Sequence, residues 1–238
     1  MAAFTIKIAG HTASVNALFD STRHYCARYL TEEEPEFSIT VTREDLQKEQ
    51  TALLEEAKRE GIRPRVFTDP FLERAAIQNK LARHLLEKDI LLLHGSAVAV
   101  DGRGYLFTAD CGTGKSTHTR LWREVFGSRT VMVNDDKPFL KLTGREVFLC
   151  GSPWSGKHGL DTNVTVPLKG ICILCRGSEN RIWGISPEEG SPALRKQCNA
   201  PNSPLVDMLG EIVPLWQMEC TKEPRAAEIS YQAMSQRG

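Results

Sequence analysis

The sequence predicts a mixed α/β protein, with a small N-terminal α+β unit over residues 1–88 and a β-rich domain over residues 89–238. Composition is the first reason, because 41% hydrophobic and 25% charged residues in 238 suffice for a sizeable core. The second is a change of pattern near residue 89, after which short strands and tight turns dominate. The third is a single glycine-rich loop between a strand and a helix in the later region.

The N-terminal unit is expected to hold two strands and two helices, over residues 4–8, 37–41, 42–61 and 69–88. Alternating apolar and polar residues indicate the strands. Thr42 and Asp45 form an acidic variant of a capping box at the start of the first helix. Pro70 suits the first position of the second helix. The unit contains no recognisable catalytic cluster.

The second region is expected to alternate short strands with a few helices. Strands are predicted over 90–93, 96–100, 105–108, 130–133, 139–142, 147–149, 170–175 and 181–185. Helices are predicted over 115–125, 187–194 and 204–216. Asp101 and Gly102 begin a hairpin turn.

Charge and cysteine content exclude several classes of protein. Thirty Lys+Arg against thirty Asp+Glu give a net charge of zero, so no nucleic-acid partner is expected. No apolar run approaches the roughly 18 residues that cross a bilayer, so no membrane partner is expected. Seven scattered cysteines and the lack of a secretory signal favour reduced thiols in the cytoplasm. Cys172 and Cys175 lie in an apolar run, which favours buried strand residues over zinc ligands.

The loop over residues 109–117 nearly matches the phosphate-binding pattern G-x-x-x-x-G-K-[ST], with Ala109 in place of the first glycine. Glycines let backbone N–H groups wrap around a polyphosphate, and the following helix adds its positive end. Ala109 must then avoid a positive φ. The expected nucleotide-binding residues are Asp110, Cys111, Gly112, Thr113, Gly114, Lys115, Ser116 and Thr117. A glycine-rich turn that only resembles the motif is the alternative.

An apolar strand ends in Asn134, Asp135 and Asp136 about twenty residues beyond the loop. Adjacent carboxylates at a strand end can divide the work between Mg²⁺ binding and proton acceptance. The alternative is a solvated turn, because Asn and Asp are also good turn residues. His94 follows another apolar run and alone would be read as an ordinary strand-end residue.

These segments together resemble a known family. Residues 93–98 (Leu-His-Gly-Ser-Ala-Val), 106–116 and 133–136 are similar in order and spacing to the catalytic domain of HPr kinase/phosphorylase. The resemblance covers roughly residues 90–185. It implies a β-rich core of the phosphoenolpyruvate carboxykinase type around one loop-and-helix unit, and ATP and Mg²⁺ as cofactors.

The resemblance also implies a role for each matched position. Lys115 and Ser116 would hold the nucleotide phosphates and the metal. Asp135 would be the base and Asp136 the metal ligand, although the sequence leaves an exchange of these roles open, so Asp135 is also a candidate ligand. His94 would lie near the γ-phosphate and assist the base.

Several features depart from HPr kinase itself. Thr117 stands where those enzymes tend to carry an acid, and neither their N-terminal domain nor their HPr-handling segment can be matched. HPr is therefore not expected as the substrate, and the chain looks closer to shorter relatives that act on free small molecules or peptides. Carboxykinases are much longer, and their oxaloacetate-binding arginine has no counterpart here. Because HPr kinases assemble, a homo-oligomer is a further expectation.

The loop over residues 150–159 combines glycines, a proline and cationic side chains. Such a loop suits an anionic transition state, so Ser155, Lys157 and His158 are expected to border the acceptor or the transferred phosphoryl group, with Lys157 counted as catalytic. The alternative is a surface turn with Trp154 packed inward. Four further cations, which are more often solvated than phosphate-binding at such positions, are Arg176, Arg181, Arg195 and Lys196.

The expected function is an ATP- and Mg²⁺-dependent kinase that transfers the γ-phosphoryl group to a hydroxyl of a small molecule or a peptide side chain. The alternatives are a nucleotide-binding regulator without transfer activity and a simple NTPase. The acceptor, and the choice between ATP and GTP, stay open.

Overall fold

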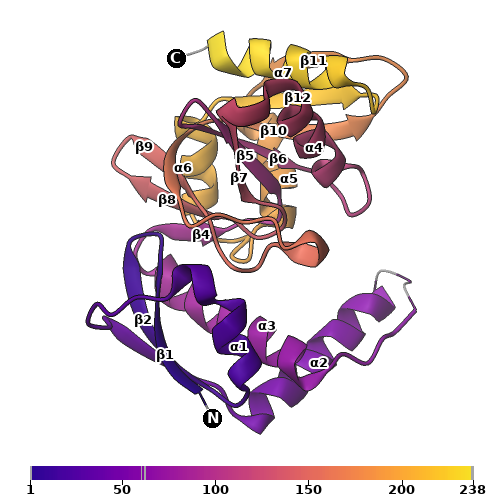
Figure 1. Cartoon of the computed structure of the whole chain (residues 1–238). Coiled ribbons are helices and arrows are strands. Elements are labelled where there is room, and N and C mark those ends of the chain that lie inside the picture. Colours follow the sequence, from indigo (N-terminus) through magenta and orange to yellow (C-terminus); the bar gives the residue numbers. More distant parts are fainter. Residues whose placement is uncertain (1, 60, 62, 237–238) are drawn as a thin grey trace. The chain divides into compact units, whose positions relative to one another are not determined.

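The computed structural model describes residues 2–59, 61 and 63–236, which divide into two compact units, residues 1–87 and 88–238. Lys88, which the sequence analysis assigned to the first unit, belongs to the second. Both units mix strands and helices (Figure 1). Within the described residues no helix is both long and apolar enough to span a bilayer.

The first unit is a three-stranded sheet with helices. Its elements are β1 Ala2–Ile8, β2 His11–Ala17, α1 Asp20–Tyr25, a 3-10 turn Ala27–Tyr29, β3 Phe37–Thr40, α2 Arg43–Arg59 and α3 Asp69–Leu86. The sheet order is β1-β2-β3, in which β2 pairs antiparallel with β1 and parallel with β3. The predicted strands and helices are present, and the predicted cap exists, since the Thr42 and Asp45 side chains each accept the other's backbone N–H. β2 and α1 were not predicted.

The second unit is built on a curled mixed sheet. Its strands are β4 Ile90–Leu92, β5 Ser96–Val100, β6 Arg103–Thr108, β7 Thr130–Asn134, β8 Phe139–Thr143, β9 Glu146–Cys150, β10 Thr165–Arg176, β11 Arg181–Ile185 and β12 Leu215–Cys220. Its helices are α4 Lys115–Phe126, α5 Pro187–Gln197, α6 Leu205–Ile212 and α7 Pro224–Gln236, with 3-10 turns at Gly127–Arg129 and Gly156–His158.

The long strand β10 joins the two parts of this sheet. Residues 165–167 of β10 pair antiparallel with β9, which continues to β8 and β4. Residues 168–173 pair parallel with β6, and residues 171–176 pair parallel with β12. β6 continues through β5 to β7, both antiparallel. The strand that precedes the glycine-rich loop is therefore central, with a parallel neighbour on one side and an antiparallel one on the other.

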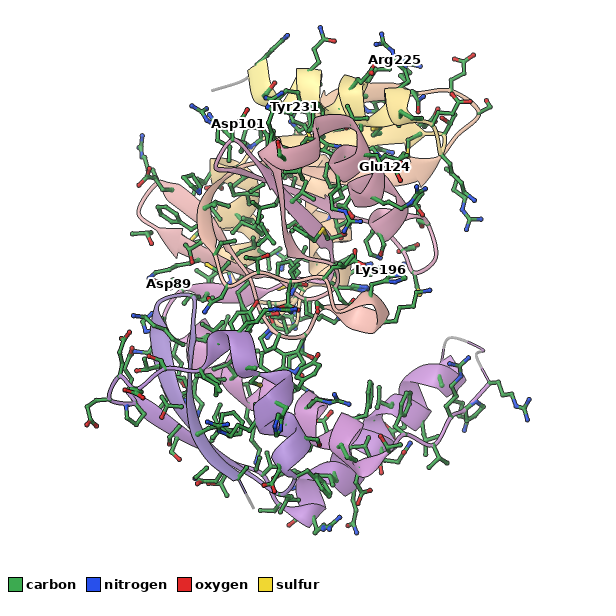
Figure 2. All side chains as sticks on the ribbon, viewed as in Figure 1. Asp89, Asp101, Glu124, Lys196, Arg225 and Tyr231 are labelled. Carbon is green, nitrogen blue, oxygen red and sulfur yellow. The ribbon has the colours of Figure 1, made fainter. Side chains whose placement is uncertain are left out.

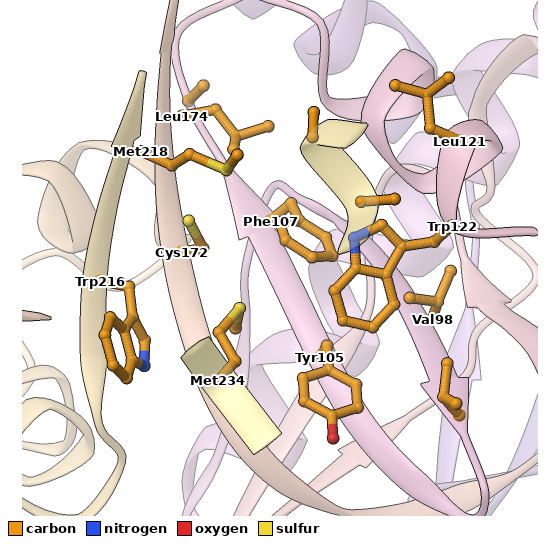
Figure 3. Close-up of a cluster of buried hydrophobic side chains, with 14 of the residues drawn as sticks. Val98, Tyr105, Phe107, Leu121, Trp122, Cys172, Leu174, Trp216, Met218 and Met234 are labelled. Carbon is orange, nitrogen blue, oxygen red and sulfur yellow. The ribbon is translucent and has the colours of Figure 1, made fainter. Parts of the chain in front are cut away.

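Helices α4 and α7 cover one face of this sheet. Their apolar side chains share a buried cluster with residues of β5, β6, β7, β10 and β12. Figure 3 shows Tyr105 and Phe107 of β6 close to Trp122 of α4, and the ring centroids lie 4.8 and 5.2 Å from that of Trp122. Packing of α4 against the central strand fixes the helix start, and with it the loop before α4.

The structure corrects the predicted helix over residues 204–216. α6 ends at Ile212, and Leu215 and Trp216 belong to β12. Val213 has extended dihedrals, φ −101 and ψ 127, which is what a residue before proline favours. Pro214 also lacks the N–H that a continuing helix needs. α7 was not predicted.

Candidate functional site

The loop between β6 and α4 has the conformation that the motif requires. Gly112 has φ +74, and Gly114, the N-cap of α4, has φ +126. A Cβ at either glycine would meet nothing within 4 Å, so left-handed backbone is what favours glycine there. Ala109, which stands where the motif has its first glycine, is not among the described non-glycine residues with positive φ. An alanine is therefore compatible with the backbone at this position. As at any helix start, the N–H groups of the first turn of α4 have no acceptor within the helix.

Lys115 is held against the loop backbone. Its ammonium donates to the carbonyl of Ala109 at 2.9 Å and to that of Asp110 at 3.5 Å, and the residue is only 8% exposed. Burial lowers the pKa of Lys115, and the nearby Cys111 and Asp136 oppose this shift only in part. A charged amine that is poorly hydrated gains from an anion placed in the same space.

Asp135 is buried and receives a hydrogen bond from a relay of hydroxyl groups. The Ser96 hydroxyl donates to Asp135 Oδ1 at 2.6 Å and lies 2.7 Å from Thr119 Oγ1. Ser96 and Thr119 are themselves almost fully buried. The relay connects β5 and α4 to the carboxylate and fixes its orientation.

Asp136 faces a different environment. Its Oδ1 lies 3.2 Å from His94 Nε2. Burial alone would raise the pKa of Asp136, but the hydrogen bond from His94 and the charges of Lys137, His94 and Lys115 together hold it below its usual value. His94, expected to assist the base Asp135, thus contacts the neighbouring acid instead.

Backbone contacts hold the acid pair and His94 together. Asn134 Oδ1 accepts from the N–H of Asp136 at 2.8 Å and of Lys137 at 2.6 Å, while its amide donates to the carbonyl and hydroxyl of Ser152. The Gly95 N–H donates to the Asp136 carbonyl at 2.9 Å. A Cβ on Gly95 would lie 2.8 Å from Leu106 Cδ1 and 3.0 Å from the Phe107 carbonyl, so a glycine is needed beside β6.

These groups share one cavity of about 580 Å³. It is lined by His94, Cys111, Gly112, Gly114, Lys115, Ser116, Thr117, Asp135, Asp136, Gly156, Lys157 and His158. The structure thus brings together most of the predicted site residues from four separate segments: His94, the glycine-rich loop, the acid pair and the loop with Lys157. Among the predicted nucleotide-binding residues, Asp110 and Thr113 are the exceptions, because they line a neighbouring cavity.

The predicted acceptor loop contributes to the cavity only through its second half. Lys157 and His158 are exposed and line the cavity, and Gly156 adopts φ +68 beside Asp136. Ser155 is 1% exposed, donates to Asp161 Oδ1 at 2.7 Å and does not line the cavity. Trp154 is packed inward at 6% exposure. Ser155 and Trp154 therefore support the loop from inside.

The neighbouring cavity, of about 440 Å³, lies between the loop, β10 and α5. Arg176, one of its lining residues, donates to the Gly112 carbonyl at 2.6 Å, and Lys196 pairs with Asp110 at 2.6 Å (Lys196 is labelled in Figure 2). Arg195 instead binds Asp207, and Arg181 lies over the Trp183 ring. Of these four cations, Arg176 and Lys196 contact the glycine-rich loop.

No group of three His, Cys, Asp or Glu side chains suited to a metal ion occurs among the described residues. A magnesium ion in a phosphoryl-transfer site normally needs only one or two carboxylates, because substrate phosphates and water complete its shell. The donor set of Ser116, Asp135 and Asp136 around one cavity fits that requirement. The open glycine loop at a helix N-terminus fits a polyphosphate.

Sequence comparison finds no matching family model and no matching curated protein. Among solved structures, the HPr(Ser) kinase/phosphatase from Coxiella burnetii matches with a TM-score of 0.38 and 14% identity. The match covers 62% of this chain and 99% of that chain. At this TM-score the likeness is distant, and it identifies neither the activity nor the substrate of this chain.

Proposed function

We propose that the protein is an ATP- and Mg²⁺-dependent kinase that transfers the γ-phosphoryl group to a hydroxyl of a small molecule or a peptide side chain. One observation carries this proposal: a glycine loop at the start of α4 and two carboxylates with different surroundings line a single cavity. A protein that only binds a nucleotide needs the loop alone. An acid pair beside the loop suits an enzyme that transfers a phosphoryl group.

The loop and α4 would hold the phosphates. Backbone N–H groups of the first turn and the Lys115 ammonium supply positive charge without a conformational change of the glycines. Ser116 on the first turn and Asp136 would hold Mg²⁺, which neutralises phosphate charge when bound. The lowered pKa of Asp136 keeps that carboxylate ionised, as a metal ligand must be, and makes it a weak base.

Asp135 is left as the proton acceptor. Ser96 occupies one of its oxygens and orients the group, so the second oxygen can accept the proton of the incoming hydroxyl. Lys157 lines the same cavity, where its charge would stabilise the transferring phosphoryl group. His94 fixes Asp136 and thereby positions the metal ligand.

Two substitutions separate nucleotide binding from transfer. Lys115→Ala should weaken Mg–ATP binding by roughly tenfold or more, because it removes the buried ammonium. Asp135→Asn keeps the shape of the side chain and should leave nucleotide affinity within about threefold, while transfer falls by about 10²-fold or more. Calorimetry measures binding, and mass detection of phosphate gain in a metabolite extract measures transfer. Exposed Lys222→Ala and Glu179→Gln are matched controls.

The same experiment distinguishes the alternatives. Phosphate release without any acceptor would indicate an NTPase, and nucleotide binding without turnover would indicate a regulator. If Mg–ATP does not bind to the folded wild-type chain at millimolar concentration, the proposal is wrong.

A further inference from the structure

A further cavity adjoins the 580 Å³ cavity at Asp135 and constrains the acceptor of the proposed kinase. This acceptor cavity, of about 260 Å³, shares Ser116, Thr117, Asp135 and His158 with the larger one. A phosphoryl group held by the loop would therefore lie at the junction, with Asp135 accessible from both sides. The acceptor hydroxyl is expected to approach from the smaller side.

Beyond the junction, the wall of the acceptor cavity is cationic. Arg120 and Arg123 project from successive turns of α4, and Met132 and Leu160 complete the wall with apolar surface. Asp135 is the only acidic residue among the described residues that line this cavity. The acceptor hydroxyl would bind the one carboxylate, Asp135. The two guanidinium groups then favour a ligand that carries negative charge at a distance from that hydroxyl.

Arg123 lacks a partner for a buried donor. Its Nε is inaccessible to solvent and makes no hydrogen bond among the described residues. An unsatisfied buried N–H is unfavourable, so a ligand that draws the partly exposed Arg123 side chain into the cavity could give this group an acceptor. Arg120 binds Glu124 at 2.5 Å, but both side chains are half exposed, and Glu124 does not line the cavity (Glu124 is labelled in Figure 2). Such exposed ion pairs are weak, so an anionic ligand can replace Glu124 as the partner of Arg120.

The dimensions indicate a small ligand. The acceptor cavity, at about 260 Å³, is smaller than the roughly 300–1,000 Å³ of pockets that take drug-sized ligands. Arg120 lies four residues beyond Ser116, which is about 6 Å along the helix axis. The cationic wall therefore begins about one helical turn beyond Ser116.

We propose that the acceptor is a small alcohol that carries a carboxylate or a phosphate monoester, with Arg123 and Arg120 as the residues that select the anion. This inference rests on the proposed kinase function. In the transfer, the hydroxyl oxygen of the acceptor forms a bond to the γ-phosphorus and the bond to the ADP oxygen breaks. The hydroxyl proton passes to Asp135, and the products are ADP and the phosphorylated acid.

The test measures binding of three related alcohols to the full chain by calorimetry. A non-hydrolysable ATP analogue and Mg²⁺ are kept saturating, so that the loop is not free to bind the added anions. Glycerate and glycerol 3-phosphate supply the two anions, and glycerol is their neutral counterpart. We expect at least one anion to bind about tenfold or more tightly than glycerol, and the preferred anion identifies the group.

Variants assign the selection to Arg123. Arg123→Gln should reduce the anion preference by roughly tenfold. Arg123→Lys should restore it only in part, because lysine keeps the charge but loses the planar fork of guanidinium donors. Arg225→Gln on α7, whose partner is Glu228, is the matched control and should change nothing (Arg225 is labelled in Figure 2). Tryptophan fluorescence checks that each variant is folded.

The outcomes distinguish this inference from the proposed function. If the ATP analogue binds but no anion binds better than glycerol, or if Arg123→Gln leaves the preference unchanged, the anionic acceptor is wrong and the kinase proposal stands. If the folded chain does not bind the ATP analogue, both proposals fail.

Discussion

His118 is a buried side chain from which we expect acid sensitivity of the second unit. It is 2% exposed, accepts a hydrogen bond from Trp122 Nε1 at 3.2 Å, and has a buried Nδ1 without a partner in the described structure. Burial lowers its pKa from 6.5 to about 4. The sequence analysis gave His118 no role, although it shares the apolar face of α4 with Leu121 and Trp122.

We expect the second unit to lose stability as the pH falls from 6.5 to 4. In that range the unfolded chain binds a proton at His118 and the folded chain does not, so protonation favours unfolding; above pH 6.5 the contribution is fully present. The loss is about 3 kcal/mol at most. Urea unfolding followed by tryptophan fluorescence measures it, because Trp122, Trp154, Trp183 and Trp216 all belong to this unit.

His118→Phe should flatten this pH dependence, because the phenyl group fills the space without titrating, and Trp122 keeps its bond to Ser230 Oγ. Exposed His158→Asn serves as the control and should retain the wild-type dependence. An unchanged pH dependence in His118→Phe would show that other groups cause the acid sensitivity.

At the scale of elements, the sequence predicted those strands, helices and turns whose characteristic residues lie next to one another in the chain. The turn at Asp101 and Gly102 was predicted as a hairpin, and both residues have positive φ in the connection of β5 to β6. β12 was not predicted, because a short apolar run before and after Pro214 does not by itself distinguish helix from strand. The pairing of residues 215–220 with β10 and β11 makes this segment a strand.

The candidate site also contains some residues that short sequence motifs predicted and others that they did not. Lys115, Ser116, Asp135 and Asp136 lie in short motifs that the sequence displays. The Ser96–Thr119 relay and the contact of Arg176 with Gly112 join segments far apart in the chain. No local spacing encodes such contacts, because they depend on which strands neighbour β6. The sequence therefore predicted side chains that line the cavity but not the residues that orient them.

Gly95 couples the connection between β4 and β5 to the acid pair, so we expect Gly95→Ala to affect both stability and binding. The added methyl group would press on Leu106 and on the Phe107 carbonyl, at a cost of about 1–3 kcal/mol. Displacement of the Gly95 N–H from the Asp136 carbonyl should also weaken Mg–ATP binding. Urea unfolding and calorimetry measure the two effects.

Gly102→Ala separates these effects. It forces alanine to φ +75 in the hairpin turn, at a cost of about 1–2 kcal/mol, but a Cβ there meets nothing within 4 Å. It should therefore lower stability without changing nucleotide affinity. Equal losses of affinity in both variants would indicate that Gly95 acts only through overall stability.

At the scale of the whole molecule, the chain consists of two units with separate sheets. The first has an organising group of its own: Glu73 is fully buried, and its carboxylate accepts from the N–H groups of Leu18 and Phe19 and from the Thr22 hydroxyl. The second contains every proposed nucleotide, metal and acceptor residue, and its own buried aromatic cluster.

We therefore expect residues 88–238 to fold alone and to bind Mg–ATP with an affinity within about threefold of that of the full chain. The tryptophan emission of this fragment should match that of the full chain, because all four tryptophans lie in it. Lys115→Ala in the fragment should reduce binding as it does in the full chain. A folded fragment that no longer binds Mg–ATP would contradict the expectation, since it would mean that residues 1–87 contribute to the nucleotide site.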